Sequence, residues 1–173
     1  GTRQLAVGLM PAILGEPERW PAIVVFPQKP DQKSQWADHD DMVMAILERT
    51  RLEFNNDANR RYLTGLSQGG AGTWAIGAKH TDVWAAIAPV CGYGEPAALA
   101  PSLASLPIWA FHGMKDDVVK PEQTVAIIAA IKAVVTKKSG NAAFAADGWF
   151  RTGDIAAVEP DRTLRIVGRR SEE

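Results

Sequence analysis

The chain has 173 residues, which is enough for one domain with its own hydrophobic core and too few for two ordinary domains. Hydrophobic residues make up 46% and charged residues 23%, the composition of a globular protein. A net charge of −1 leaves no basic excess, which argues against a nucleic-acid-binding protein. No apolar run reaches the length of a membrane span. The single cysteine, Cys91, excludes an internal disulfide.

The first residues carry neither a starting methionine nor a signal-peptide pattern. The opening segment, "GTRQLAVGLMP", has a composition that allows a helix. We therefore expect that the natural N-terminus lies upstream of Gly1, and the sequence assigns no compartment.

Four short apolar runs, each followed by a turn signal, predict strands. They are Ala22–Phe26, Tyr62–Leu66, Ala85–Val90 and Ile108–Phe111. None alternates cleanly between polar and apolar residues, which is typical of strands buried on both faces of a parallel sheet.

Helical patterns separate these runs. They cover Asp38–Arg49, Gln68–Lys79 and Pro121–Val135. The first begins with acidic residues and the third has proline at a favourable first position. Strands that alternate with helices predict an α/β fold, with a parallel sheet and flanking helices.

The pattern changes after Thr136–Asn141. The segment Gly148–Arg170 predicts two short strands around a polar turn at Glu159–Arg162, which is the pattern of a β-hairpin. We therefore divide the chain near residue 140 into a partial α/β domain, 1–140, and a small hairpin segment, 141–173.

The stretch Tyr62–Trp74, "YLTGLSQGGAGTW", contains the pattern G-x-S-x-G, formed by Gly65, Ser67 and Gly69. A nucleophilic serine projects from a sharp strand-to-helix turn, and the residues two before and two after it must be small. The helix that follows directs its N-terminal N–H groups toward developing oxyanion charge. We interpret Ser67 as a nucleophile and the N–H of Gln68 as an oxyanion donor. The alternative is a chance match, because the pattern is short.

An acidic pair follows the predicted strand Ile108–Phe111, in the pattern H-G-x-x-D-x-x-V that starts at His112. In α/β-hydrolase order, the acid of a catalytic triad comes after the serine, in a turn at the carboxyl end of a strand. Asp116 fits this position, with Asp117 as the fallback. The alternative is that these acids only cap the helix that starts at Pro121.

Residues 5–135 resemble the α/β-hydrolase superfamily, and within it the carboxylesterase, dienelactone-hydrolase and predicted-peptidase branch. The matching phrases are "PAIVVFPQ", "RRYLTGLSQGGAGTWAIGAKHTDVWAAIAPVCG" and "LPIWAFHGMKDDVV". Members of that group are serine esterases, some of which act on aryl or feruloyl esters of plant cell walls. The resemblance implies hydrolysis of a small-molecule ester through an acyl-enzyme, without cofactor or metal, with Ser67 attacking and Asp116 orienting a histidine base.

The resemblance also implies a histidine after the acid, and no histidine follows His112. His39 begins the acid-led helix, where we expect a solvated position. His80 lies near the end of the helix after Ser67, where it complements the helix dipole. The family has a histidine at the position of His112 without using it as the base. We therefore assign none of the three as the general base.

Relatives carry a strand with a His-Gly oxyanion loop ahead of the segment that resembles "QLAVGLMPAIL". We expect that loop, one oxyanion donor and the first strands to be missing from this chain. In the family's order, the missing third strand lies between the strands matched by Ala22–Phe26 and Tyr62–Leu66. Exposed sheet edges should therefore favour self-association.

The tail Asp147–Glu173 resembles another family, the segment that joins the two domains of AMP-forming acyl-CoA synthetases. Its pattern is G-W-F-x-T-G-D, a hairpin, then I-x-G-R. The resemblance implies that Asp154 matches the acid on the adenylate ribose and Arg169 the arginine near the phosphate. The ATP-binding core is absent from this chain, so we expect these two positions to be inert.

These observations predict a truncated α/β-hydrolase core joined to a synthetase-like fragment, a chimera. Our first hypothesis is a serine ester hydrolase, impaired because its base and oxyanion loop are missing. The alternatives are a remnant of an adenylate-forming ligase, and a chimeric fragment without function.

Overall fold

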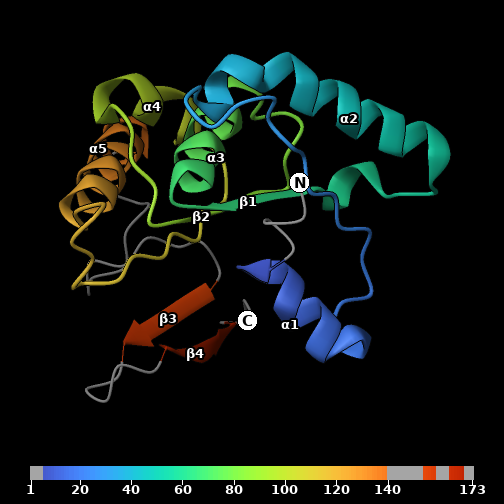
Figure 1. Ribbon diagram of the computed structural model, residues 1–173. Helices are drawn as coiled ribbons and strands as arrows, with labels where there is room; N and C mark the ends of the chain where they lie inside the picture. Colours follow the sequence, from blue (N-terminus) through green and yellow to red (C-terminus); the bar gives the residue numbers. More distant parts are fainter. Residues whose placement is uncertain (1–5, 140–153, 159–163, 170–173) are drawn as a thin grey trace.

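The computed structural model describes residues 6–139, 154–158 and 164–169. At its centre lie two parallel strands, β1 (Tyr62–Leu66) and β2 (Ala86–Val90), joined by the helix α3 (Gln68–Lys79) (Figure 1). Tyr62 pairs with Ala86 and Leu66 with Val90. The predicted parallel α/β arrangement around Ser67 is therefore confirmed, with β2 beginning one residue later than expected.

The predicted strand Ile108–Phe111 extends the sheet on the far side of β2. The N–H of Trp109 donates to the carbonyl of Ile87 at 3.0 Å, and the N–H of Phe111 donates to that of Pro89 at 3.0 Å. Both flanking bridges, at Ile108 and Phe111, are parallel. The segment is thus a short edge strand, paired through isolated bridges.

The predicted strand Ala22–Phe26 is wrong. Its residues form no strand, and Ile23 and Val25 remain 47% and 43% exposed. A strand needs a neighbour to satisfy its backbone N–H and C=O groups. Within the described ranges, β1 pairs only with β2, so Ala22–Phe26 has no partner strand.

Two helices and three 3-10 turns precede β1 in the described chain. A short helix, α1 (Leu9–Gly15), confirms that the first residues can be helical. A 3-10 turn, η3 (Trp36–His39), leads into α2 (Asp40–Glu53), so the predicted helix Asp38–Arg49 begins with a tighter turn and runs four residues further. Two further 3-10 turns are η2 (Pro17–Arg19) and η4 (Ala58–Arg60).

The helix α4 (Pro96–Leu103) packs against α3, and α5 (Glu122–Ser139) packs against α4. The second confirms the predicted helix and extends it. The sequence pattern did not predict α4, because Pro101 lies inside it and proline usually argues against a helix. Pro96 stands at the start of α4, where a missing N–H costs nothing.

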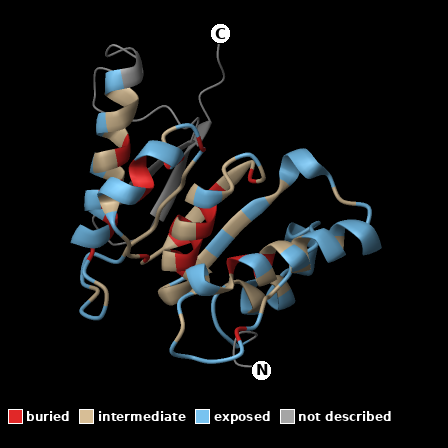
Figure 2. Cartoon of the chain, turned by 90° about the horizontal axis from the view of Figure 1, so that it is seen from above, coloured by how far each residue is buried: buried red, intermediate tan, exposed pale blue. Residues whose placement is uncertain are grey.

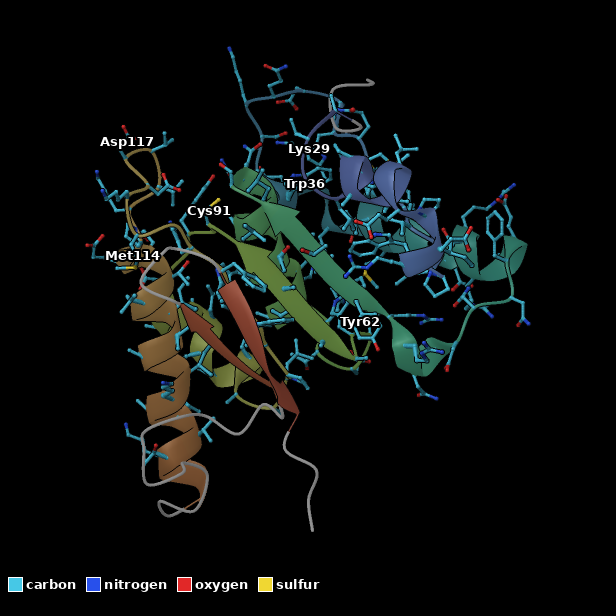
Figure 3. All side chains as sticks on the ribbon, turned by 90° about the horizontal axis from the view of Figure 1, so that it is seen from below. Lys29, Trp36, Tyr62, Cys91, Met114 and Asp117 are labelled. Atoms are coloured by element: carbon cyan, nitrogen blue, oxygen red, sulfur yellow. The ribbon has the colours of Figure 1, made fainter. Side chains whose placement is uncertain are left out.

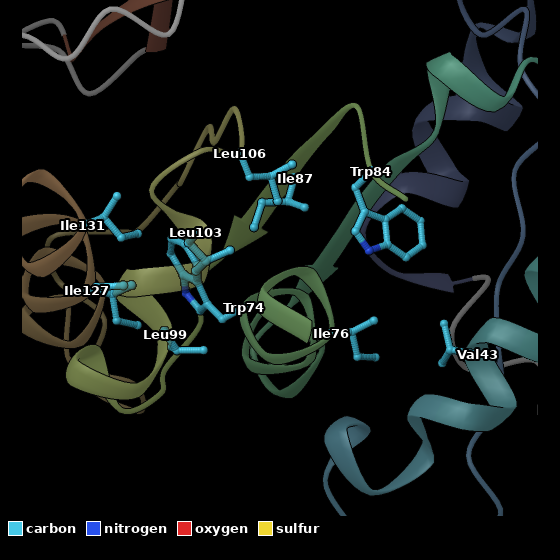
Figure 4. Packing of buried hydrophobic residues seen from close by; sticks show 11 residues of the cluster. Val43, Trp74, Ile76, Trp84, Ile87, Leu99, Leu103, Leu106, Ile127 and Ile131 are labelled. Carbon is cyan, nitrogen blue, oxygen red and sulfur yellow. The ribbon is translucent and has the colours of Figure 1, made fainter. Parts of the chain in front are cut away.

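The hydrophobic core lies on both sides of α3. Figure 4 shows Trp74 meeting Leu103 and Ile127 between α3, α4 and α5, and all three side chains are fully buried. On the other side Ile76 faces Val43 of α2. Figure 2 shows the buried positions gathered along α3. Each large buried side chain contributes about 2 kcal/mol to stability. Since α3 provides buried side chains on both sides, it joins the two parts of the core.

The predicted hairpin is present near the C-terminal end of the chain. Its strands, β3 (Asp154–Val158) and β4 (Leu164–Arg169), are antiparallel, and Asp154 pairs with Arg169. The turn Glu159–Arg162 and the junction near residue 140 lie outside the described residues. The domain division and the roles of Asp154 and Arg169 therefore stay predictions. No described helix is both long and apolar enough to cross a membrane.

A buried carboxylate joins α2 to the end of α3. Asp40 is 4% exposed, and its oxygens accept hydrogen bonds from Lys79 and, at 2.9 Å, from Nε2 of His80. Burial alone would raise the pKa of Asp40, but the hydrogen bonds and charges of Lys79 and His80 outweigh it and lower that pKa. The ionised form of Asp40 therefore stabilises the contact between the two helices.

We predict that Asp40→Asn lowers the free energy of unfolding by about 2 kcal/mol at neutral pH, because two charge-assisted hydrogen bonds are lost. Since the pKa of Asp40 is lowered on folding, its contribution is present above its ordinary pKa and disappears as the pH falls through the folded value. Urea unfolding of both proteins over a pH series measures the difference. Asp41→Asn is the control, because Asp41 lies exposed in the same turn. Equal stability of the Asp40 variant and the parent at neutral pH would contradict the prediction.

Candidate active site

Ser67 occupies the tight turn between β1 and α3. Its backbone has φ 56° and ψ −114°, a conformation that residues other than glycine rarely adopt. Such a residue stores about 1–3 kcal/mol of strain, which the surrounding structure must offset. The N–H of Ser67 donates to the carbonyl of Val90 at 2.9 Å. This bond fastens the turn to the carboxyl end of β2.

Glycines allow the close backbone contacts around this turn. A Cβ on Gly65 would lie 2.3 Å from the carbonyl oxygen of Gly69, and a Cβ on Gly70 would lie 2.5 Å from that of Val90. The expectation that the residue two after Ser67 must also be small is not supported by the packing. A Cβ on Gly69 would meet nothing within 4 Å. The crowding therefore falls on Gly65 and Gly70.

Gln68, the predicted oxyanion donor, is the first residue of α3. The intrahelical bonds begin with the N–H of Ala71, which donates to the carbonyl of Ser67 at 3.0 Å. The N–H groups of 68–70 precede that bond, so they face the end of the helix at which the dipole is positive. Gln68 itself is half-buried. Its role as an oxyanion donor stays a prediction.

Asp116 lies in the turn that follows the edge strand Ile108–Phe111. One of its oxygens, Oδ1, accepts from the N–H groups of Val119 at 2.9 Å and Val118 at 3.0 Å. These two bonds hold the pKa of Asp116 below its ordinary value. Both bonds stay within the turn and involve no N–H group of α5. They therefore do not support the alternative that Asp116 only caps this helix. Asp117, the fallback, is exposed.

The carboxyl ends of the parallel strands bring Ser67 and Asp116 to the same edge of the sheet. β1 ends just before Ser67, and the edge strand ends five residues before Asp116. Loops at this edge are where α/β sheets hold their ligands. The second oxygen of Asp116, Oδ2, lies 3.6 Å from Nε2 of His112.

His112 is held inside its own turn. Its Nδ1 lies 2.7 Å from the hydroxyl of Thr124, and its Nε2 lies 2.8 Å from the carbonyl of Val119. Only 5% of its side chain is exposed. Thr124 in turn donates to the carbonyl of Gly92 at 3.1 Å. Both ring nitrogens of His112 are therefore occupied, which agrees with its exclusion as a base.

The other two histidines have partners away from Ser67 as well, and these partners correct the roles expected for them. His39 is not simply solvated: its Nε2 lies 2.6 Å from the hydroxyl of Ser34, with 19% of its side chain exposed. His80 follows the last residue of α3, but its ring bonds Asp40 rather than only facing the helix end. Among the described contacts, no histidine bonds the hydroxyl of Ser67.

A residue that the sequence motifs did not assign to the site lies beside Gln68. Lys29 is 8% exposed, and its Nζ donates to Oε1 of Gln68 at 2.8 Å. Figure 3 shows Lys29 and Trp36 near the carboxyl end of β1. One indication of this position was present in the sequence, because Lys29 follows the turn that ends the apolar run Ala22–Phe26. Without a neighbouring strand in view, however, nothing in the sequence placed that turn next to the helix start.

Comparisons with known proteins point to one fold. No protein-family model matches the chain. A curated relative, a bifunctional acetylxylan esterase/xylanase of Neocallimastix patriciarum, is 32% identical over 108 residues. Among solved structures, a thermostable esterase superposes with a TM-score of 0.52 at 34% identity. SOBER1 of Arabidopsis thaliana superposes with a TM-score of 0.47 at 25% identity.

These matches cover only parts of the proteins. The match covers 58% of this chain and 16% of the acetylxylan esterase/xylanase. The superposition on the thermostable esterase covers 54% of this chain and 25% of that structure, and the one on SOBER1 covers 62% and 53%. The chain thus spans a quarter or less of the first two proteins.

We predict opposite effects for alanine at the two glycines that flank Ser67. Gly65→Ala should lower the free energy of unfolding by about 1–3 kcal/mol, because the new Cβ overlaps backbone that cannot move aside. Gly69→Ala should be neutral or stabilising by up to about 1 kcal/mol, because it adds helix propensity in open space. Urea unfolding midpoints measure both, and each variant serves as the control for the other. Equal destabilisation by the two substitutions would show that the packing around the turn is not as described.

Proposed function

The chain belongs to the α/β-hydrolase superfamily, and we propose that it is a serine ester hydrolase that forms an acyl-enzyme on Ser67. The observation that carries this proposal is the strained backbone of Ser67 in a turn between a strand and a helix. A costly conformation persists only where the surrounding structure enforces it, and such residues gather at reactive sites. The likeness to a thermostable esterase supports the same class of reaction.

The proposed reaction uses this turn to hold both the nucleophile and the developing charge. The Oγ of Ser67 attacks the carbonyl carbon of the ester and loses its proton, and the carbonyl oxygen becomes negative. The N–H of Gln68 and the positive end of α3 stabilise that oxygen. The carbon–oxygen bond to the alcohol then breaks, and the alcohol leaves with a proton. Water hydrolyses the acyl-serine and restores Ser67.

Asp116 is proposed as the acid that orients a histidine base. Its Oδ1 is committed to backbone N–H groups, whereas Oδ2 accepts from no backbone N–H in the described turn. The three histidines of this chain bond other partners, so when no other base is supplied we propose that water takes the proton of Ser67. Because a positioned base contributes about 10²–10⁴-fold to the rate, we propose slow turnover and a longer-lived acyl-serine. Acetyl esters are the first substrates to test, given the acetylxylan esterase relative.

We predict that a fluorophosphonate probe labels the chain and that Ser67→Ala abolishes the labelling, together with any turnover of p-nitrophenyl acetate above buffer. Both reactions need the Oγ of Ser67 as the attacking atom. Intact-protein mass spectrometry reads the adduct. The matched control is Ser105→Ala, since Ser105 is exposed and its described side-chain hydrogen bond is to the carbonyl of Ser102 in its own turn. Unchanged labelling of the Ser67 variant would rule out this nucleophile.

We also predict that added imidazole raises the Ser67-dependent turnover of p-nitrophenyl acetate by about tenfold or more, because it supplies the missing general base. Asp116→Asn should reduce this gain, since the carboxylate that orients and stabilises the imidazolium is lost. The Ser67→Ala protein gives the direct reaction of imidazole with the ester, which is subtracted.

Asp117→Asn is the control for the charge change, because Asp117 is exposed beside Asp116. A rescue that is equal in the parent and in both aspartate variants would remove Asp116 from the proposed mechanism. It would leave Ser67 as the nucleophile, since the labelling experiment tests that role separately.

A further inference from the structure

Lys29 is a buried cation without a carboxylate partner among the described ion pairs. Its Nζ donates to the carbonyl of Ser34 and, at 2.8 Å, to Oε1 of Gln68. The ammonium lies 5.6 Å from the centre of the Trp36 ring (Figure 3). Burial of an ammonium costs several kcal/mol unless its protons are bound. Two carbonyl oxygens and one aromatic face therefore take the place of water around Lys29.

Hydrogen bonds join Lys29, the side chain of Gln68 and the carbonyl of Ser34 to one another. The Nε2 of Gln68 donates to the carbonyl of Ser34 at 3.1 Å, the same carbonyl that accepts from Lys29. The described contacts of the Gln68 side chain are these two, both to the loop before η3. The loop is itself braced, because Ser34 donates its N–H and its hydroxyl to Asp31. The first residue of α3 is thus held from outside the helix.

We propose that Lys29 is a positioning residue for acyl transfer. It fixes Gln68 so that the N–H of that residue faces the oxyanion formed at Ser67. This inference rests on the proposed function, because it needs Ser67 to be the nucleophile. An N–H group stabilises an oxyanion best when it is held in place beforehand, and the buried Lys29 holds Gln68 in this way.

The test is a double-mutant cycle on the labelling of Ser67 by a fluorophosphonate. The maximal labelling rate and the concentration that gives half of it are measured for the parent, Lys29→Met, Gln68→Met and the double variant. Lys29→Met should lower the maximal rate by about 10–100-fold and leave the half-saturating concentration nearly unchanged. The double variant should be no slower than the slower single variant, because Lys29 acts through Gln68.

Two further variants separate charge from folding. Lys29→Arg keeps the charge and the donors and should recover most of the rate. Lys33→Met removes an exposed lysine of the same loop and should label like the parent. Thermal unfolding and near-ultraviolet circular dichroism show which proteins are folded.

The outcomes distinguish this inference from the function on which it rests. A folded Lys29→Met protein that labels at the parental rate, or additive losses in the double variant, overturns the role of Lys29 and leaves Ser67 in place. If Lys29→Met does not fold, Gln68→Met decides, and parental labelling by that variant overturns the inference. A parent without Ser67-dependent labelling overturns both proposals.

Discussion

The structure depends on the close backbone contact between the end of β1, the first turn of α3 and the end of β2. Gly65 and Gly70 permit this contact, because a Cβ on either would overlap main-chain atoms. The bond from Ser67 to the carbonyl of Val90 then locks the turn in a conformation that a serine does not otherwise adopt. The same contact sets how α3 lies on the sheet, so the core around Trp74 and the position of the half-buried Ser67 have one cause.

Polar side chains fasten the segment before β1 to both ends of α3. At the end of the helix, Asp40 of α2 bonds Lys79 and His80. At the start, Lys29 bonds Gln68. A segment that makes no strand is thereby held against the helix through charged and amide groups instead of a hydrogen-bonded ladder. Such contacts depend on geometry and on ionisation, so this part of the molecule should respond to pH more than the apolar core.

The local elements were predictable where neighbouring residues in the chain decide them. The strand, turn and helix around Ser67 follow from an apolar run, a glycine-flanked serine and small residues at helical spacing, and the structure places each within a residue of its predicted bounds. The hairpin of β3 and β4 is equally local. Ala22–Phe26 had the same apolar signal and formed no strand, because a strand also needs a partner. The helix α4 was missed because Pro101 broke the pattern without breaking the helix.

The amino-acid order alone specified Ser67 in its turn, Asp116 in its turn, and the absence of a histidine after His112, because each depends on spacing along the chain. Contacts between segments distant in sequence settled the rest. They showed that Gly70, not Gly69, is the crowded glycine after Ser67, and that His39, His80 and His112 each have other partners. They also brought Lys29 to Gln68, thirty-nine residues away. Folding a parallel sheet joins residues from successive turns at one edge, and no local pattern records which side chains meet there.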